Sequence, residues 1–228
     1  RDIGVTGVQT CALPIYVIQA DLRKEGLPSA ASLASRGFSR PLVDAHSELF
    51  HGGRPMPLAR WPNDGQWDRI DGFPAASGHG DEHGGNVGEV SGGFHYAGDR
   101  PSRWRDTSDI WVHGYWAWDW ANSYERIELL DTQRRLVRTA PPHGLYGFRK
   151  GQRIQFLNIL EELDAPGEWF IDRKEGVLYF WPPDTAHGRG SRTPETLVSA
   201  MGGPFFRLDG CSHVVVDGLT LEIGRAHV

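Results

Sequence analysis

The stretch YERIELLDTQRRLVRT, residues 124–139, decides the fold class of this chain. Aromatic and aliphatic residues interleave with charged ones in its first half, which is typical of a strand with one buried face. The polar segment at residues 131–134 then separates this strand from a second one at residues 135–139. Two strands joined by so short a polar segment form a hairpin. The sequence therefore predicts a mainly β protein.

Two further hairpins are predicted outside this stretch, each a pair of apolar runs around a turn. Their strands are residues 48–50 with 56–60, and residues 168–172 with 177–181. The first pair closes over Gly52-Gly53, a glycine pair of the kind that tight hairpin turns require. The best helix candidate is short, at residues 157–163, with Asn158 as its N-cap.

Composition indicates a folded, turn-rich chain without a basic surface. The 228 residues suit one domain, and 9 Trp with 10 Phe can supply a core. The 29 Gly and 15 Pro match the many turns of an all-β architecture. A formal net charge of −5 disfavours a nucleic-acid or anionic-membrane partner, since both need a basic field. The sequence contains no run of 18 apolar residues, so it predicts no membrane-spanning helix.

The two ends of the sequence look like the translation of a DNA sequencing adapter. A strand that can encode TCALPI at residues 10–15 has a complement that encodes IGRAHV at residues 223–228. We therefore expect residues 1–15 and 222–228 to be adapter-derived and to add nothing to the fold. Cys211 is then the one remaining cysteine, so cysteine usage indicates no disulfide.

Residues 196–221 have a different pattern from the rest of the chain. Short apolar runs are broken at Gly and Asp-Gly every few residues, with no helix-forming segment between them. Such runs are typical of the successive sides of a parallel β-helix coil, in which each coil buries its inward side chains against the next. This segment predicts part of a β-helix coil.

A zinc-peptidase spacing occurs in the glycine-rich stretch at residues 73–93. His79, Glu82 and His83 match the His-x-x-Glu-His pattern, which needs both histidines on one face of a helix. The glycines around the motif disfavour that helix, so we expect a solvated loop and no metal site. The sequence also has no P-loop or dinucleotide fingerprint, and we expect no cofactor.

Trp116, Trp118 and Trp120 recur at every second position and would share one face of a strand. Two interpretations stay open for this face. Its aromatic planes can stack on sugar rings while Asp119 or Asp109 bonds the sugar hydroxyls, or its rings can pack a core. The sequence thus offers Trp116, Trp118, Trp120 and Asp119 as substrate-binding candidates.

The acidic segment at residues 161–164 offers carboxylates for glycosidic bond cleavage, which needs two carboxyl groups flanking the bond. On a helix, however, the adjacent Glu161 and Glu162 point in different directions. Carboxylates at the start of a helix also have a simpler electrostatic role there. We therefore name no catalytic residue.

Several stretches resemble bacterial right-handed parallel β-helix, pectate-lyase-like repeat proteins. They are residues 48–50 with 58–63, 98–101 with Trp104, 113–116 with 119–120, 158–164, 166–169 and 176–183. The resemblance covers residues 47–221, and the group includes glycoside hydrolases that act on plant or algal polysaccharides.

The resemblance implies the opening coils of a right-handed parallel β-helix with an inserted antiparallel β-rich module. On this basis residues 16–60 are expected to form N-terminal strands of the β-helix. Residues 61–195 are expected to form the inserted module, with a glycine-rich loop at 73–93, and residues 196–221 the resuming coil.

The same resemblance implies a fragment of a secreted or periplasmic, polysaccharide-active protein, first of all a glycoside hydrolase. In such enzymes the catalytic carboxylates lie on later coils, so the chain alone is expected to be inactive. A non-catalytic carbohydrate-binding protein and a polysaccharide lyase stay open as alternatives. Each of the three takes a polysaccharide or an oligosaccharide as its partner.

Overall fold

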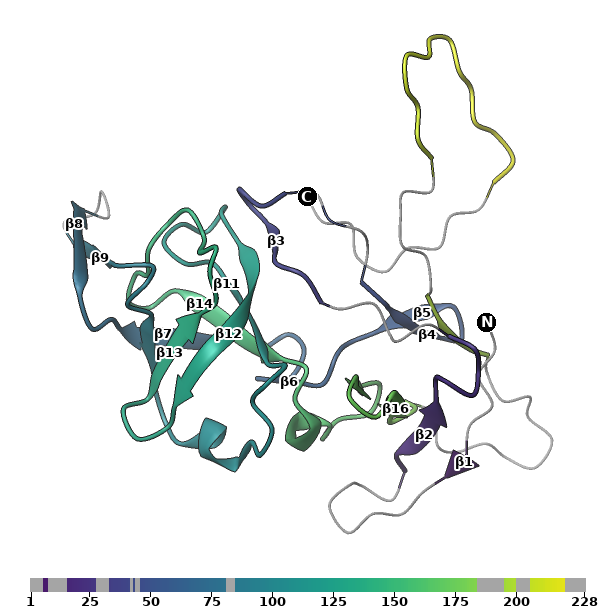
Figure 1. The fold of residues 1–228 in the computed structure, drawn as a ribbon, viewed down its shortest axis with the longest axis horizontal. Coiled ribbons are helices and arrows are strands. Elements are labelled where there is room, and N and C mark those ends of the chain that lie inside the picture. The colour runs from purple at the N-terminus through teal and green to yellow at the C-terminus, as the bar shows by residue number, and fades with distance from the viewer. Residues whose placement is uncertain are drawn as a thin grey trace.

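A closed, six-stranded antiparallel barrel is the main feature of the protein (Figure 1). The computed structural model describes residues 6–7, 16–27, 33–41, 43, 46–80, 85–183, 195–199 and 206–219. The barrel strands follow the order β11–β12–β13–β10–β7–β14, and β14 pairs back with β11. They are β7 (Asp68–Gly72), β10 (Phe94–Tyr96), β11 (Trp111–Gly114), β12 (Ser123–Asp131), β13 (Leu136–Thr139) and β14 (Arg153–Leu157).

The predicted hairpin at residues 124–139 is confirmed as β12 and β13. Its turn is held by the carboxylate of Asp131, which accepts hydrogen bonds from the backbone N–H groups of Gln133 and Arg134 at 3.0 and 2.9 Å. A short acidic side chain at the start of a turn makes such bonds readily. Two short strands flank the barrel, β3 (Arg36–Gly37) beside β12 and β6 (Arg60–Trp61) beside β14.

Aromatic and aliphatic side chains fill the barrel. The buried set is Ile70, Phe94, Tyr96, Trp104, Ile110, Val112, Trp116, Ile127, Val137, Phe148, Ile154, Phe156 and Ile159. On the first half of β12 the buried positions alternate, with Ser123, Glu125 and Ile127 inside. This alternation is the side-chain period of a strand with one face inside and one face in solvent.

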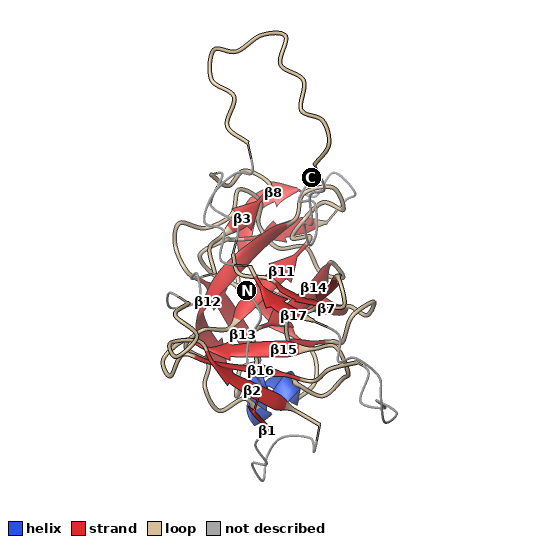
Figure 2. Cartoon of the chain, turned by 90° about the vertical axis from the view of Figure 1, so that its right-hand side faces the viewer, coloured by secondary structure: helices blue, strands red, loops and turns tan. Residues whose placement is uncertain are grey.

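Smaller sheets lie beside the barrel (Figure 2). One follows the order β1–β2–β16–β15, a second the order β17–β4–β5, and a third pairs β8 with β9. Their strands are β1 (Thr6–Gly7), β2 (Ile18–Asp21), β4 (Leu49–His51), β5 (Arg54–Met56), β8 (Ala76–Gly80), β9 (Asn86–Gly88), β15 (Trp169–Asp172), β16 (Val177–Phe180) and β17 (Thr196–Val198). The hairpins predicted around Gly52-Gly53 and residues 173–176 are confirmed as β4–β5 and β15–β16.

A second hydrophobic core lies between the two larger of these sheets and the barrel. It contains Ala20, Leu22, Leu27, Leu33, Leu49, Leu58, Trp111, Leu157, Trp169, Ile171, Leu178, Phe180 and Val198. Trp111 and Leu157 belong to barrel strands β11 and β14, so the barrel wall is shared by both cores. The barrel and the smaller sheets therefore pack against each other through apolar side chains.

The prediction of a parallel β-helix is wrong. Every strand pair that the structure describes is antiparallel, apart from an isolated parallel bridge between Leu58 and Trp169. In the segment predicted to be the resuming coil, β17 pairs antiparallel with β4. Short apolar runs specify which face of a strand is buried but leave its direction open. Gly210 and Gly218 lie in the part of this segment that contains no strand.

The later part of that segment, residues 206–219, contains no strand and projects from the body (Figure 1). Its apolar side chains, which were expected to form a coil, are exposed: Phe206, Leu208, Val214, Val215, Val216 and Leu219. Leu221 lies outside the described residues.

At the other end, Thr6–Gly7 pairs with β2, inside the segment that we predicted to be adapter-derived. The rest of residues 1–15 lies outside the described part of the chain, as do residues 222–228. In the residues that the structure describes, no helix is long and apolar enough to cross a membrane.

Two local predictions also differ from the structure. The helix predicted at residues 157–163 is a single 3₁₀ turn, η2 (Leu160–Glu162), because Asn158 has a left-handed backbone with φ of 63° and Ile159 is extended. Residues 73–93 were predicted to be a loop, yet they contain the ribbon of β8 and β9. A second 3₁₀ turn, η1 (Arg100–Arg103), precedes β11.

Glu168, next to β15, makes the stability depend on pH. Its Oε2 accepts hydrogen bonds from the backbone N–H groups of Asp164 and Ala165. Burial raises the pKa of this carboxyl group to about 8. The folded state therefore holds a proton that the unfolded state releases above its ordinary pKa of 4.5. Stability is then lost as the pH rises from there towards 8, by at most about 1.4 kcal/mol per pH unit.

We expect Glu168→Gln to flatten this decline, because glutamine does not ionise. Thermal unfolding measured between pH 5 and pH 8 should show a smaller fall in midpoint for this variant than for the wild type. Glu175→Gln, at an exposed glutamate in the β15–β16 turn, is the control and should follow the wild type. Parallel curves for wild type and Glu168→Gln would contradict the assignment.

Candidate functional site

The chain turns sharply after β11, so the three tryptophans do not share a strand face. Gly114 ends β11, and a side chain there would overlap the ring of Trp116, which folds back over it. The backbone N–H of Ala121 then donates to the carbonyl of Trp118 at 3.1 Å and closes a turn. The prediction of a strand at residues 116–120 is therefore wrong, and the turn places Trp116 apart from Trp118 and Trp120.

Trp116 belongs to the barrel core. Its ring lies 5.9 Å from that of Phe94 and 5.5 Å from that of Phe148. Its indole Nε1–H donates to the hydroxyl of Ser123 at 2.7 Å. Trp116 thus packs inside the barrel with its polar atom satisfied.

A buried polar chain continues from this bond and ties a loop to the barrel. The hydroxyl of Ser123 donates to Oε1 of Glu125 at 2.5 Å, and Arg40 donates to both carboxylate oxygens of Glu125. The side chains of Arg40 and Glu125 are only 5% and 2% exposed. Arg40 also donates to the carbonyl of Pro142 at 2.7 Å, so one ion pair anchors two segments at this end of the barrel.

Four aromatic side chains gather on the surface beside this anchor: Phe38, Trp118, Trp120 and Tyr146. We call them the aromatic cluster. The ring of Tyr146 is stacked with Phe38 at 5.8 Å and meets Trp118 and Trp120 edge-on at 6.4 and 5.8 Å. Phe38 meets Trp120 edge-on at 5.0 Å. Trp120 is 61% exposed although it belongs to this cluster, so a large aromatic surface faces solvent.

Gly37 explains how Phe38 reaches the cluster. The glycine has φ of 110°, and a Cβ at this position would lie 2.5 Å from the carbonyl oxygen of Asn122. Only glycine permits this backbone conformation and this close approach. The N–H of Phe38 then donates to the same carbonyl at 2.8 Å, which holds the ring beside Trp120.

A surface cavity of about 720 Å³ opens between the aromatic cluster and the β8–β9 ribbon. We call it the aromatic cavity. Trp118, Trp120, Leu145 and Tyr146 form its apolar wall. Ser77, His79, Glu89 and Ser91 supply polar groups from the ribbon and the loop after it. An apolar wall that faces a few hydrogen-bonding side chains is the usual composition of a small-molecule site.

The structure brings together only some of the residues that the sequence offered. Trp118 and Trp120 border the aromatic cavity, whereas Trp116 is in the core. Asp119 is exposed outside the cavity and accepts a hydrogen bond from Arg153 at 3.3 Å. Asp109 lies elsewhere, bonded to Arg173.

The carboxylates of the acidic segment at residues 161–164 accept hydrogen bonds from residues 100–105. Arg100 donates to both oxygens of the buried Glu162, and to Asp164 at 2.8 Å. The indole of Trp104 also donates to Glu162 at 2.5 Å. Glu161 accepts the backbone N–H of Arg105 at 3.2 Å. Glu162 and Asp164 are thus occupied by ion pairs.

The zinc-peptidase spacing does not lie on a helix in the described residues. His79 is on strand β8, while Glu82 and His83 lie outside the described part of the chain. In that part, no group of three or more His, Cys, Asp and Glu side chains could hold a metal ion.

Sequence reasoning missed Phe38 and Tyr146, which complete the aromatic cluster. A signal for Tyr146 was present, since it stands between Gly144 and Gly147 in a short loop with an apolar neighbour, Leu145. Phe38 has no such signal, because its position depends on the pairing of β3 with β12.

Comparison with known proteins gives little beyond this geometry. No protein-family model matches the sequence, and no curated protein matches it. Among solved structures, a protein described as "Glycoside hydrolase" is similar, with 16% sequence identity and a TM-score of 0.48. The similar region covers 87% of this chain and 30% of that protein, so the chain spans less than a third of its length.

Proposed function

We propose that this chain binds a carbohydrate in the aromatic cavity. The observation that carries the proposal is the exposed aromatic wall of Trp118, Trp120 and Tyr146 opposite polar side chains of the β8–β9 ribbon. A sugar ring has apolar C–H faces that pack on aromatic planes, and a rim of hydroxyl groups. Carboxylate, imidazole and hydroxyl side chains can donate to or accept from those hydroxyls.

Packing alone does not account for the aromatic cluster. A core aromatic such as Trp116 is buried and its indole N–H is bonded, whereas Trp120 keeps most of its surface in water. Large exposed apolar surfaces next to polar groups mark binding sites more often than chance. The anchor of Arg40 and Glu125 also holds the backbone beneath the cluster, which reduces the entropy lost on binding.

The finer form of the proposal is a binding part of a secreted or periplasmic glycoside hydrolase. The sequence resemblance supports it. The carboxylates at residues 162 and 164 are taken up by Arg100, so we assign no cleavage step to this chain. A purely carbohydrate-binding protein and a polysaccharide lyase remain the alternatives, and they differ in the catalytic groups that the whole protein carries.

Replacing Trp120 by alanine should weaken glycan binding by about ten- to hundredfold. Truncating an aromatic platform under a stacked nucleic-acid base costs about 1–3 kcal/mol, and we expect a similar loss for a stacked sugar ring. Titration calorimetry with xylohexaose and with a fucosylated oligosaccharide measures the affinity, and a reducing-sugar assay on the same mixtures should show no cleavage.

Tyr16→Ala is the matched control, since it removes an exposed aromatic side chain that does not border the aromatic cavity. Its affinity should equal that of the wild type. Trp118→Ala tests a second residue of the wall and should also weaken binding. Wild-type affinity in both tryptophan variants would show that the cavity is not the binding site.

A further inference from the structure

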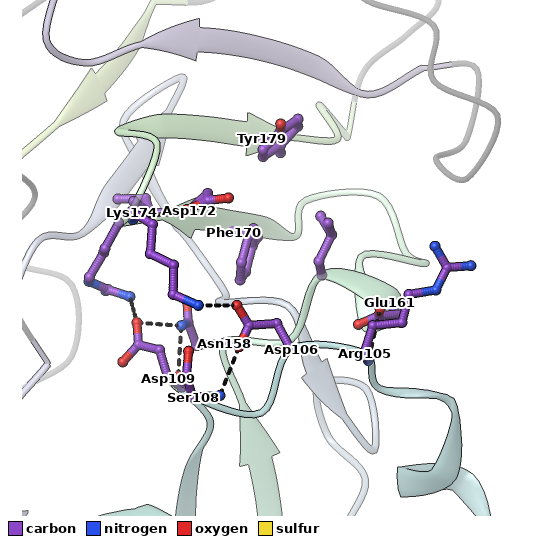
Figure 3. A pocket seen from close by; sticks show the side chains of 13 residues that line it. Arg105, Asp106, Ser108, Asp109, Asn158, Glu161, Phe170, Asp172, Lys174 and Tyr179 are labelled. Carbon is purple, nitrogen blue, oxygen red and sulfur yellow. Dashed lines mark hydrogen bonds and ion pairs between the residues drawn. The ribbon is translucent and has the colours of Figure 1, made fainter.

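A second cavity, of about 620 Å³, lies between the β15–β16 hairpin and the loop that leads into β11 (Figure 3). We call it the hairpin cavity. Phe170 and Tyr179 form an aromatic wall on the hairpin, with ring centres 6.3 Å apart and planes tilted by 33°. Neither Trp118 nor Trp120 borders this cavity, so it is separate from the aromatic cavity.

Two ion pairs join the hairpin to the loop across this cavity. Lys174 donates to Oδ2 of Asp106 at 2.6 Å, and Arg173 donates to Oδ2 of Asp109 at 2.5 Å (Figure 3). The turn that carries both cations is held by Asp172, whose carboxylate accepts the backbone N–H of Lys174 at 2.9 Å. The two ion pairs therefore place hydrogen-bond donors and acceptors opposite the aromatic wall.

The Asp106–Lys174 pair is open to solvent and persists in mild acid. Its side chains are 63% and 65% exposed, so further hydrogen bonds from a ligand can reach both. The hydrogen bond from Lys174 lowers the pKa of Asp106 to about 2. The pair thus presents one acceptor group and one donor group side by side over a wide pH range.

Asn158 adds an unused acceptor at the cavity wall. Its amide nitrogen donates to the carbonyl and to the carboxylate of Asp109, at 2.9 and 3.0 Å. Its Oδ1 is buried and has no hydrogen-bond partner in the described structure. A buried polar atom left without a partner destabilises the folded state. Asn158 borders the cavity, so a ligand hydroxyl bonded to this oxygen would recover part of that loss.

The charge balance of the lining disfavours an anionic ligand. Four carboxylates, those of Asp106, Asp109, Glu161 and Asp172, face three cations, those of Arg105, Arg173 and Lys174. Two of the cations are already bound to carboxylates. A uronic acid would have to compete with these carboxylates, whereas a neutral hydroxyl can bond both members of a pair.

We propose that the hairpin cavity is a second carbohydrate subsite, selective for short neutral oligosaccharides over uronic-acid ones. One sugar ring packs on Phe170 and Tyr179, and its hydroxyls bond to Asp106 and Lys174. This second subsite takes the same class of ligand as the proposed function, but no residue lines both cavities.

The test uses the full chain with Trp118 and Trp120 both replaced by alanine, so that only the hairpin cavity remains intact. Calorimetry with xylotriose should still detect binding to this double variant, and trigalacturonate should bind at least about tenfold more weakly. Adding Lys174→Ala should weaken xylotriose binding by about tenfold, since it removes a charged hydrogen-bond donor to the sugar.

The matched control is Lys150→Ala, which removes an equally exposed lysine from an ion pair with Asp71 outside the cavity. It should leave xylotriose binding unchanged. No binding to the double tryptophan variant, while the wild type binds, would overturn the second subsite and leave the aromatic cavity as the site. Equal effects of Lys174→Ala and Lys150→Ala, or tighter binding of trigalacturonate, would also overturn it.

Discussion

Replacing Arg40 by alanine is expected to destabilise the protein by about 3–5 kcal/mol. Arg40 is the charged partner of Glu125, whose carboxylate is almost fully buried at the end of the barrel. Removing one member of a buried ion pair leaves an uncompensated charge in a medium of low polarity. Urea unfolding followed by circular dichroism measures the loss. Because Arg40 also holds the loop at Pro142, the aromatic cavity next to it should lose its shape.

A double variant separates the buried charge from lost packing. Arg40→Ala combined with Glu125→Gln should recover part of the stability, since glutamine carries no charge and still accepts the hydroxyl of Ser123. Arg134→Ala removes an exposed arginine from a 3.9 Å ion pair with Asp131 and should cost less than about 1 kcal/mol. If Arg40→Ala were no more harmful than Arg134→Ala, the buried pair would not hold this end of the barrel.

Phe156→Ala is expected to cost a similar amount, about 3–5 kcal/mol, for a different reason. Phe156 lies on β14 and is fully buried in the barrel, with the rings of Trp104, Trp61 and Tyr96 at 5.2, 6.0 and 6.2 Å. Truncation leaves a cavity among rigid aromatic rings that cannot collapse to fill it. The same urea titration, with the near-ultraviolet signal of the tryptophans as a second probe, reports this loss.

The control for Phe156 is Phe206, which is 42% exposed on the projecting segment. Phe206→Ala should change the free energy of unfolding by less than about 0.5 kcal/mol. A small effect at Phe156, comparable to that at Phe206, would contradict a closed barrel packed around this ring.

The hairpins were predictable because their signals are local. Gly52-Gly53 and the polar segment at residues 131–134 specify turns through chemistry that acts within a few residues. Asp131 and Asp172 each bond two backbone N–H groups of their own turn, so tertiary contacts are not needed to place them. Three of the hairpins in the structure follow from such signals.

The closure of the barrel was not predictable in the same way. It depends on β14 pairing with β11, β7 and β6, which lie far away in the sequence. The direction of β17 likewise depends on β4, some 145 residues earlier in the chain. Side-chain alternation marks the buried face of each strand, but it contains no information on which strand lies beside it. The parallel β-helix was inferred from short apolar runs and from a family resemblance, and neither specifies which strands pair; the prediction was wrong.

The sequence predicted that tryptophans would form the candidate site, but it did not predict which aromatic residues come together there. Trp116, Trp118 and Trp120 were grouped by spacing, but Trp116 lies in the barrel core and the other two lie at the surface. The overlap that a side chain at Gly114 would make with the Trp116 ring is a tertiary effect that spacing does not reveal. Phe38 joined the cluster through β3, a strand of two residues that no periodicity marks.

Carbohydrate binding in the aromatic cavity can be tested by an oligosaccharide titration that follows the indole N–H signals of the nine tryptophans. Nuclear magnetic resonance resolves one such signal per tryptophan. We expect the signals of Trp118 and Trp120 to shift with xylohexaose or with a fucosylated oligosaccharide. Those of Trp104 and Trp116, which are buried and bonded, should stay in place. Saturable shifts confined to other tryptophans, or none at millimolar ligand, would contradict it.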